Sequence, residues 1–278
     1  MKLAVLSGKG GTGKTFVSVN LAVTAGQSTY IDCDVEEPNG RIFLKPTDVT
    51  ESRVFTRIPA FDTEKCTGCR KCVDFCRFHA LVFIKNTPRV FHEVCHACGG
   101  CAMVCPSGAV REENRPIGVV EQGRSGAVHA LTGILNPGEA SGVPVIQAAL
   151  KQGVRDDHFV VIDCPPGSGC PVLESVSQAD ACVIVTEPTA FGFHNFQMVY
   201  QLAVLLKKPC GVVVNKAGET YEPLEQFCAE HQVPILARIP YSSRLAALGA
   251  DGQVAVEHDP DTAALFRDLY EKIGGELV

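Results

Sequence analysis

The sequence predicts an α/β fold, a doubly wound and mostly parallel sheet, with a smaller cysteine-rich unit inserted into it. Short apolar runs alternate with segments of helical spacing, and several of these runs end in polar residues, which is typical of parallel α/β sheets. A change of pattern near Pro59, lasting to about Glu113, predicts the insert. We therefore expect a discontinuous domain of residues 1–58 and 114–278 and a second domain of residues 59–113.

The first elements form a strand–helix–strand unit. Residues 2–6 are a short apolar run, residues 15–25 place apolar side chains at helical spacing, and residues 28–33 form a second apolar run. This order predicts two parallel strands joined by a crossover helix.

The same alternation returns beyond residue 115. Four apolar runs predict further buried strands: residues 159–163, 181–186, 211–215 and 233–240. Helical spacing predicts the helices beside them: residues 195–206, 223–230 and 262–273. Segment 115–158 is rich in glycine, and its pattern assigns no element.

The composition is ordinary except for its cysteines. The chain has 278 residues, 20% of them charged, and a formal net charge of −6, which argues against a general nucleic-acid binder. No apolar run reaches the ~20 residues that span a bilayer. Fourteen cysteines without a recognisable secretion signal favour a reducing compartment and metal or redox chemistry. We therefore expect a cytoplasmic protein with no membrane and no specific nucleic-acid partner.

The loop after the first strand predicts a phosphate-binding site. It fits G-x-x-x-x-G-K-[ST] between a strand and a helix with these residues: Gly8, Lys9, Gly10, Gly11, Thr12, Gly13, Lys14 and Thr15. The glycines let backbone N–H groups point at phosphate oxygens, and the helix N-terminus adds positive partial charge. We expect Lys14 to neutralise the β- and γ-phosphates and Thr15 to bind Mg²⁺. A plain glycine-rich turn is the alternative.

A second lysine early in this loop, Lys9, produces the pattern K-G-G-x-G-K-T. In this respect the chain resembles the deviant Walker A P-loop ATPases of the MinD, ParA, Mrp and nitrogenase iron-protein group. The resemblance implies slow ATP hydrolysis by a homodimer, or by a heterodimer with a paralogue, in which Lys9 reaches the partner's nucleotide. Otherwise Lys9 is a solvated loop residue.

Two further motifs extend the resemblance. The segment Tyr30-Ile31-Asp32-Cys33-Asp34 resembles the first switch of the family, in which Asp34 orients the attacking water and Asp32 lies near Mg²⁺. The segment Val161-Ile162-Asp163-Cys164-Pro165-Pro166-Gly167 resembles the second switch, in which Asp163 accompanies Mg²⁺ and Gly167 faces the γ-phosphate.

The resemblance also implies a nucleobase site and a catalytic set. Asn215 and Pro240 each stand at a strand end, where the family flanks the adenine, although an asparagine that caps a turn explains Asn215 equally well. The implied catalytic residues are Lys9, Lys14 and Asp34.

The insert contains a duplicated cysteine pattern. Cysteines at 66, 69, 72 and 76 recur 29 residues later, which matches the bacterial ferredoxin pattern. In that pattern the fourth ligand of each cluster comes from the other repeat. We therefore expect a ferredoxin-like α+β domain with two [4Fe–4S] clusters, the first on Cys66, Cys69, Cys72 and Cys105, the second on Cys95, Cys98, Cys101 and Cys76. Structural zinc is the alternative, but it usually takes two CxxC pairs with a longer spacer. Pro106 follows Cys105 as the pattern expects, whereas Arg77 follows Cys76.

With the insert, the whole chain resembles MinD-superfamily ATPases that contain a ferredoxin domain. The resemblance implies ATP/ADP, Mg²⁺ and two clusters, used for electron transfer or for maturation of a metallocofactor or an iron–sulfur protein. The implied partner is a redox protein or a metallocofactor-binding protein, similar to the orange-protein or nitrogenase-cofactor-binding type.

Two other functions stay open. One is an iron–sulfur assembly carrier of the Mrp type, although the C-terminal CxxC frequent in those carriers is missing here. The other is a spatial regulator like MinD or ParA, which the acidic total and the mixed charges of residues 265–273 disfavour.

Six cysteines lie outside the duplicated pattern. Cys182, Cys210 and Cys228 stand in apolar segments and are expected in the core. Cys33 and Cys164 neighbour the switch aspartates, where redox tuning of the ATPase is a weaker hypothesis.

Cys170 stands near the position of a cluster ligand in the nitrogenase iron protein. Segment 106–162 offers no second cysteine, so a cluster bridging two subunits is expected to be absent or labile. A transfer thiol at Cys170 is a weaker hypothesis.

Overall fold

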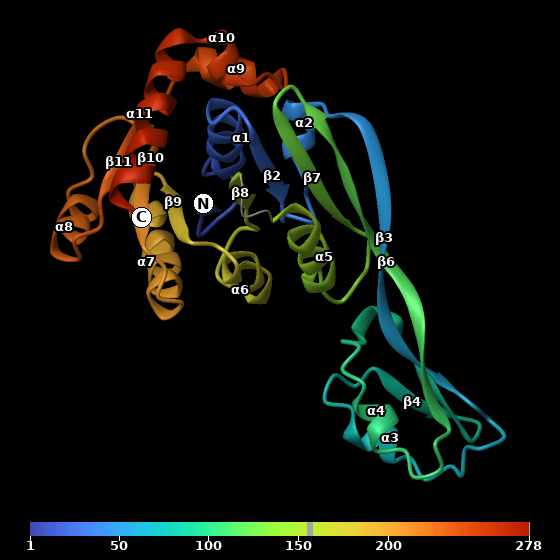
Figure 1. Ribbon diagram of the computed structural model, residues 1–278. Coiled ribbons are helices and arrows are strands. Elements are labelled where there is room, and N and C mark those ends of the chain that lie inside the picture. Colours follow the sequence, from blue (N-terminus) through green and yellow to red (C-terminus); the bar gives the residue numbers. More distant parts are fainter. Residues whose placement is uncertain (155–157, 278) are drawn as a thin grey trace.

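The computed structural model describes residues 1–154 and 158–277, and one nine-stranded sheet organises them (Figure 1). The strand order is β11-β10-β9-β1-β8-β2-β7-β6-β3, with parallel pairing from β11 to β7 and antiparallel pairing of β6 with β7 and of β3 with β6. The predicted α/β class with a mostly parallel sheet is confirmed. Residues 155–157 of the unassigned segment and Val278 lie outside the described residues.

The parallel strands are short because each is a buried apolar run that ends where the chain turns. They are β1 (Lys2–Leu6), β2 (Ser28–Asp32), β7 (Val128–Leu135), β8 (Phe159–Asp163), β9 (Ala181–Thr186), β10 (Cys210–Ala217) and β11 (Ile235–Pro240). Side chains alternate between the faces, so β1 supplies Ala4 and Leu6 to one core cluster and Leu3 and Val5 to the other.

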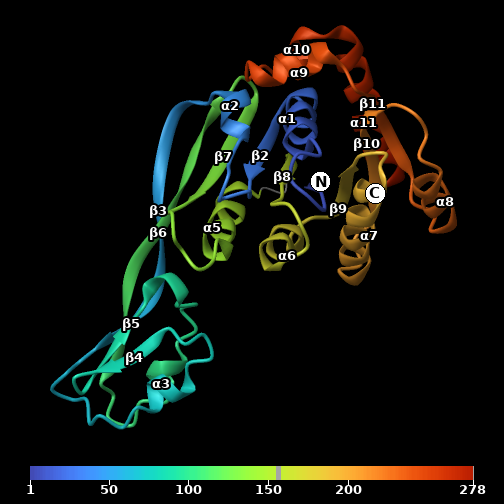
Figure 2. The ribbon, with the colours of Figure 1, turned by 180° about the vertical axis from the view of Figure 1, so that it is seen from behind.

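Helices cover both faces of the sheet, as a doubly wound fold requires (Figure 2). One face packs against four helices: α5 (Val143–Gly153), α6 (Cys170–Ser177), α7 (Ala190–Leu205) and α8 (Glu222–Glu230). The other face packs mainly against α1 (Lys14–Thr24), α2 (Gly40–Leu44) and α11 (Pro260–Glu276), with α9 (Ser243–Ala250) and α10 (Ala255–His258) at its rim.

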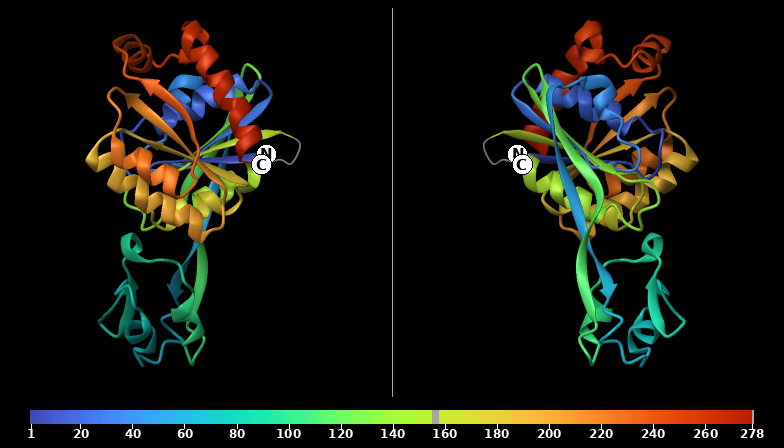
Figure 3. Two further views of the ribbon diagram at one scale, coloured as in Figure 1. Left: turned by 90° about the vertical axis from the view of Figure 1, so that its left-hand side faces the viewer. Right: turned by 90° about the vertical axis from the view of Figure 1, so that its right-hand side faces the viewer.

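A long two-stranded ribbon connects the sheet to the cysteine-rich lobe. β3 (Thr47–Phe61) and β6 (Val110–Ser125) run beyond the sheet, and the lobe lies at their far end (Figure 3). The lobe contains α3 (Lys71–Phe75), β4 (Leu81–Ile84), β5 (Thr87–Val90), a 3₁₀ turn (His92–Val94) and α4 (Gly100–Met103). The domain boundaries expected near residues 58 and 113 therefore lie inside β3 and β6.

Most predicted elements are present with small shifts. β1, β8 and β9 have the predicted bounds. α7 begins at Ala190 rather than residue 195, because the Thr189 hydroxyl accepts a hydrogen bond from Gly192 N at 3.0 Å and caps the helix there. The unassigned segment holds the end of β6, all of β7 and α5. Among the described residues no helix is long and apolar enough to cross a membrane.

Candidate functional site

The glycine-rich loop lies between β1 and α1 and lines a cavity of about 900 Å³. The cavity is bordered by the loop that follows β2 and by the starts of α5 and α6. Lys9 to Thr15 and Asp34 are in its lining, whereas Gly167, Asn215 and Pro240 are not. The strand ends therefore gather at one open cavity, where a parallel sheet usually binds ligands.

The loop is folded so closely that two of its glycines have no room for a side chain. A Cβ on Gly8 would lie 2.3 Å from the carbonyl oxygen of Asn195. Gly13 has φ +93°, and a Cβ there would lie 2.1 Å from Nδ2 of Asn215. The Asn215 amide donates to the carbonyl of Thr12 at 2.6 Å, so this residue holds the loop from the neighbouring strand β10.

One polar atom of the loop is left unsatisfied. Within the part of the chain that the structure describes, the buried hydroxyl of Thr12 makes no hydrogen bond. A buried hydroxyl without a partner is costly, and a phosphate oxygen would satisfy it.

A cluster of buried charges lies at the base of the loop. Lys14 Nζ contacts Asp163 Oδ1 at 2.7 Å and Asp34 Oδ2 at 3.6 Å. Asp32 and Asp163 are paired in register on β2 and β8, so their side chains point to the same face. Burial alone would lower the pKa of Lys14, but the charges of Asp163, Asp34 and Asp32 raise it overall. Burial and the neighbouring Asp163 raise the pKa of Asp32.

Asp32 holds the two ends of the loop after β2. Its Oδ1 accepts from Asp34 N at 3.1 Å, and its Oδ2 accepts from Gly40 N at 2.9 Å. Tyr30, on the same face of β2, donates from its hydroxyl to Asp163 Oδ2 at 2.9 Å. No role of Tyr30 was expected from the sequence, although a tyrosine two residues before Asp32 in a strand was a usable signal.

Lys9 is held within its own chain. Its Nζ contacts Glu187 Oε2 at 2.7 Å and lies 5.0 Å from the ring centre of Phe191. Glu187 also binds Lys216, through Oε1 at 2.7 Å. Burial opposes the charge of Glu187, but hydrogen bonds from both lysines lower its pKa overall. Glu187 was not among the predicted site residues, because it is far from Lys9 along the chain and belongs to no recognised motif.

In the lobe, the first predicted cysteine set lines one small cavity. Cys66, Cys69, Cys72 and Cys105 all border it, although Cys105 comes from the second repeat. Phe61 and Val110, where the ribbon ends, border the same cavity. Among the described residues no group of three or more His, Cys, Asp or Glu side chains is arranged to hold a metal ion. A cubane cluster is held differently from a single ion, because its four thiolates bind four separate iron atoms.

Three members of the second set also lie near one another. Burial, together with the charges of the neighbouring Cys95 and Cys98 thiolates, raises the pKa of Cys101 to about 11. Cys76 follows α3, and α3 packs against α4, which includes Cys101.

The other cysteines lie in three environments. Cys33, Cys164, Cys182 and Cys228 are buried, Cys210 is half-buried and Cys170 is exposed at the start of α6. Burial raises the pKa of the Cys33 and Cys164 thiols, which lowers the reactivity of both.

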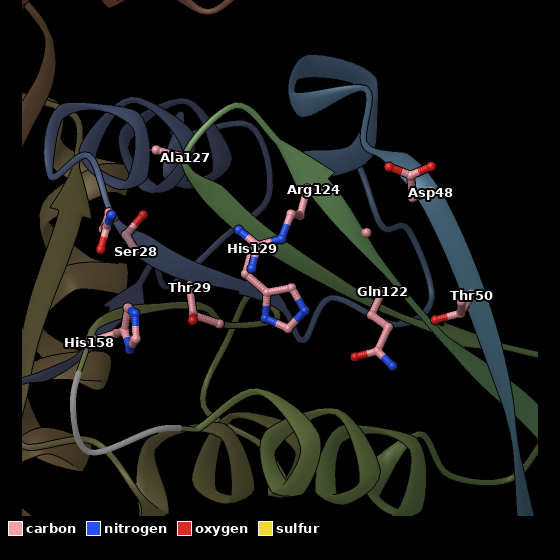
Figure 4. Close-up of a pocket in the computed structure, with 11 residues that line it drawn as sticks. Ser28, Thr29, Asp48, Thr50, Gln122, Arg124, Ala127, His129 and His158 are labelled. Atoms are coloured by element: carbon pink, nitrogen blue, oxygen red, sulfur yellow. The ribbon is translucent and has the colours of Figure 1, made fainter.

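A second hollow lies at the opposite ends of the strands (Figure 4). Its volume is about 510 Å³, and polar side chains from β2, β3, β6 and β7 surround it, among them Thr29, Asp48, Arg124 and His129. None of the predicted site residues is in its lining.

Comparison with known proteins identifies the family. The sequence pattern of the CobQ/CobB/MinD/ParA nucleotide binding domain matches residues 3–256. An uncharacterised protein of Methanocaldococcus jannaschii is 25% identical over 283 residues, which are 100% of this chain and 98% of that protein. An iron-sulfur cluster carrier protein of Pyrococcus horikoshii is 24% identical over 303 residues, which are 99% of this chain and 86% of that protein.

A solved structure has the same fold. The cell division ATPase MinD of Pyrococcus furiosus superposes with a TM-score of 0.62 at 20% identity, covering 99% of this chain and 98% of that one. Since the family pattern spans most of the sequence, the chain belongs to the CobQ/CobB/MinD/ParA nucleotide-binding domain family.

Proposed function

We propose that this chain is a nucleotide-switched iron–sulfur ATPase. It binds ATP and Mg²⁺ in the cavity at the glycine-rich loop, pairs with a second copy, and holds two [4Fe–4S] clusters in the lobe of residues 59–113. The clusters serve electron transfer, or maturation of a metallocofactor or an iron–sulfur protein. The cavity in which four cysteines of both repeats meet is the observation that favours this function over that of a plain ATPase.

The nucleotide site has a residue for each task in phosphoryl transfer. Backbone N–H groups of the loop and the free hydroxyl of Thr12 receive phosphate oxygens, and Lys14 neutralises their charge. Thr15, Asp32 and Asp163 would hold Mg²⁺, which neutralises charge on the phosphates when bound. Asp34, which lines the cavity, orients the attacking water.

Asn215 and Pro240 are proposed to flank the base. The bond from the Asn215 amide to the Thr12 carbonyl and the pairing of Pro240 with Ala217, two residues after Asn215, support this proposal. Gly167 is proposed to face the γ-phosphate. Its φ of +93° and the hydrogen bond from its N–H to Ser7 O at 2.9 Å, beside the start of the loop, support this proposal.

The dimer switch depends on Lys9. In the single chain its ammonium group is neutralised by Glu187, so reaching a partner's nucleotide requires this pair to open. The negative charge of ATP in the partner would replace that of Glu187.

The relatives named as iron-sulfur cluster carriers favour a second candidate, cluster delivery to other proteins. A carrier must release its cluster, whereas an electron-transfer cluster stays bound during turnover. Cluster transfer to an acceptor apoprotein therefore distinguishes the two functions.

Anaerobic purification tests the proposal. Eight cysteines that hold two [4Fe–4S] clusters would bind about eight iron atoms per chain. We expect this iron content, together with a visible absorption that reductant bleaches. Cys72→Ser should lower the iron content by about half, whereas Cys228→Ser, a buried thiol outside the lobe, should leave it unchanged. An iron-free wild-type protein, or equal loss in both variants, contradicts the cluster assignment.

A further inference from the structure

Tyr30 lies fully buried in the middle of β2, with its ring in the core and its hydroxyl among the switch residues. The ring packs in the core cluster that contains Val128 and Val161. A phenylalanine would fill this core equally well, so the ring alone does not explain the hydroxyl.

The hydroxyl meets both switches at once. It donates to Asp163 Oδ2 at 2.9 Å and lies 3.4 Å from Asp32 Oδ2. It also touches the start of α2, because a Cβ on Gly40 would lie only 2.1 Å from it. Gly40 in turn donates its N–H to Asp32 at 2.9 Å. A single phenol is thus in contact with both carboxylates and with the end of the first switch loop.

These contacts set the orientation of one carboxylate. Asp163 is bound at two points, with Oδ2 on Tyr30 and Oδ1 on Lys14. When Lys14 turns to the phosphates, Oδ1 loses that partner. Among the described residues, the Tyr30 bond is then the contact that still defines the rotation of the carboxylate. A carboxylate held by one fixed donor presents its other oxygen in a defined direction, which lowers the cost of binding a hard cation.

We propose that Tyr30 is a positioning residue that holds Asp163 ready for the magnesium ion of the bound nucleotide. The inference rests on the proposed nucleotide site and adds to it a residue of the first-switch segment to which the resemblance gives no role. Gly40 belongs to the same arrangement, because only a glycine there leaves space for the hydroxyl.

The test compares nucleotide binding with and without metal. ADP affinity is measured by calorimetry in Mg²⁺ and in EDTA, for wild type, Tyr30→Phe and the control Tyr270→Phe. Tyr270 packs in the same core face, against Phe159, at a distance from the switches. Since a hydrogen bond to a charged group is lost, we expect Tyr30→Phe to weaken binding in Mg²⁺ about tenfold and to leave binding in EDTA unchanged. Tyr270→Phe should match wild type in both.

The outcomes separate a failure of the Tyr30 assignment from a failure of the proposed nucleotide function. If Tyr30→Phe weakens binding equally in Mg²⁺ and EDTA, or in neither, the hydroxyl only stabilises the core and the assignment of Tyr30 is wrong. If wild type binds no ADP in either condition, the nucleotide function itself is wrong. Gly40→Ala, which displaces the hydroxyl while keeping it in the chain, should reproduce the loss in Mg²⁺, and its failure to do so also contradicts the assignment.

Discussion

The buried ion pair between Lys14 and Asp163 connects binding to stability. Removing the lysine leaves Asp163 and Asp32, which are both fully buried, side by side without the charge that neutralises them. We expect Lys14→Ala to lower the free energy of unfolding of the nucleotide-free protein by about 3 kcal/mol. Urea unfolding measures this, and Lys216→Ala, which removes a more exposed partner of Glu187, should cost less than about 1 kcal/mol. If both substitutions lower the free energy of unfolding equally, the Lys14–Asp163 ion pair is screened by solvent and the prediction is wrong.

The two ion pairs of Glu187, with Lys9 and with Lys216, make the free energy of unfolding depend on pH. The pKa of Glu187 is lowered on folding from 4.5, so its charge stabilises the protein above this value, and the stabilisation is lost as pH falls through the lower folded pKa. The difference in unfolding free energy between wild type and Glu187→Gln should therefore be largest near neutral pH and shrink below about pH 4.5. Chemical denaturation at several pH values measures it, with the exposed Glu219→Gln as the control. A difference that grows towards acid would contradict the lowered pKa.

At the scale of elements, the parallel strands could be predicted because both of their faces are buried. β8 and β9 are continuous apolar runs, and no polar alternation hides them. β3 could not be predicted, since most of its residues are exposed and its partners on β6 lie 49 to 77 residues away along the chain. α5 follows a glycine-rich stretch and begins beside a proline, so its periodicity was hidden by its surroundings.

Some residues of the candidate site could likewise be predicted from the sequence and others could not. The loop, Asp32 and Asp163 are recognisable because each lies in a short motif at a strand end. Glu187 belongs to no such motif, and the motif that includes Tyr30 gives its hydroxyl no role. Only the packing of strands brings Glu187 to Lys9 and Tyr30 to Asp163.

The ribbon allows the lobe to be removed without opening the sheet. Phe61 pairs with Val110, and Asp62 N donates to Ala109 O at 2.8 Å, so the chain enters and leaves the lobe at adjacent points. Replacing residues 63–108 by a two-residue glycine turn should produce a folded protein with unchanged ADP affinity and no bound iron. Thermal unfolding, calorimetry and iron analysis check this. Failure to fold would mean that the lobe stabilises the sheet and is no separate domain.

At the scale of the whole molecule, the ion pair between Lys9 and Glu187 bears on how two copies of the chain form a dimer. With ATP we expect wild type to form dimers in sedimentation, and Lys9→Ala to bind ATP but stay monomeric. Lys216→Ala, which removes the other lysine on Glu187, should still dimerise. ATP-dependent dimers of Lys9→Ala would show that this lysine does not bridge the subunits.

Val35, which follows Asp34 in the chain, is in contact with β7, the strand that pairs with the ribbon leading to the lobe. Val35 fits against two glycines, Gly133 on β7 and Gly142 before α5, where added Cβ atoms would lie 2.7 Å and 2.6 Å from its methyl groups. Leu135 N donates to Val35 O at 2.9 Å, and β7 pairs with β6, which continues into the lobe. If Asp34 moves when ATP binds, the adjacent Val35 moves with it and shifts its contact with β7, the strand that pairs with the ribbon. Packed interfaces of this kind move between discrete arrangements.

We expect ATP to change the rate at which a chelator bleaches the clusters in wild type. In Val35→Ala this nucleotide dependence should be lost, because the methyl groups that pack against Gly133 and Gly142 are missing. The ATP affinity should stay within about threefold of the wild-type value. Val176→Ala, a buried valine of α6 away from the ribbon, should retain the dependence. If bleaching in wild type is the same with ATP, with ADP and without nucleotide, the two sites are not coupled. If Val35→Ala keeps the dependence, the coupling follows another path.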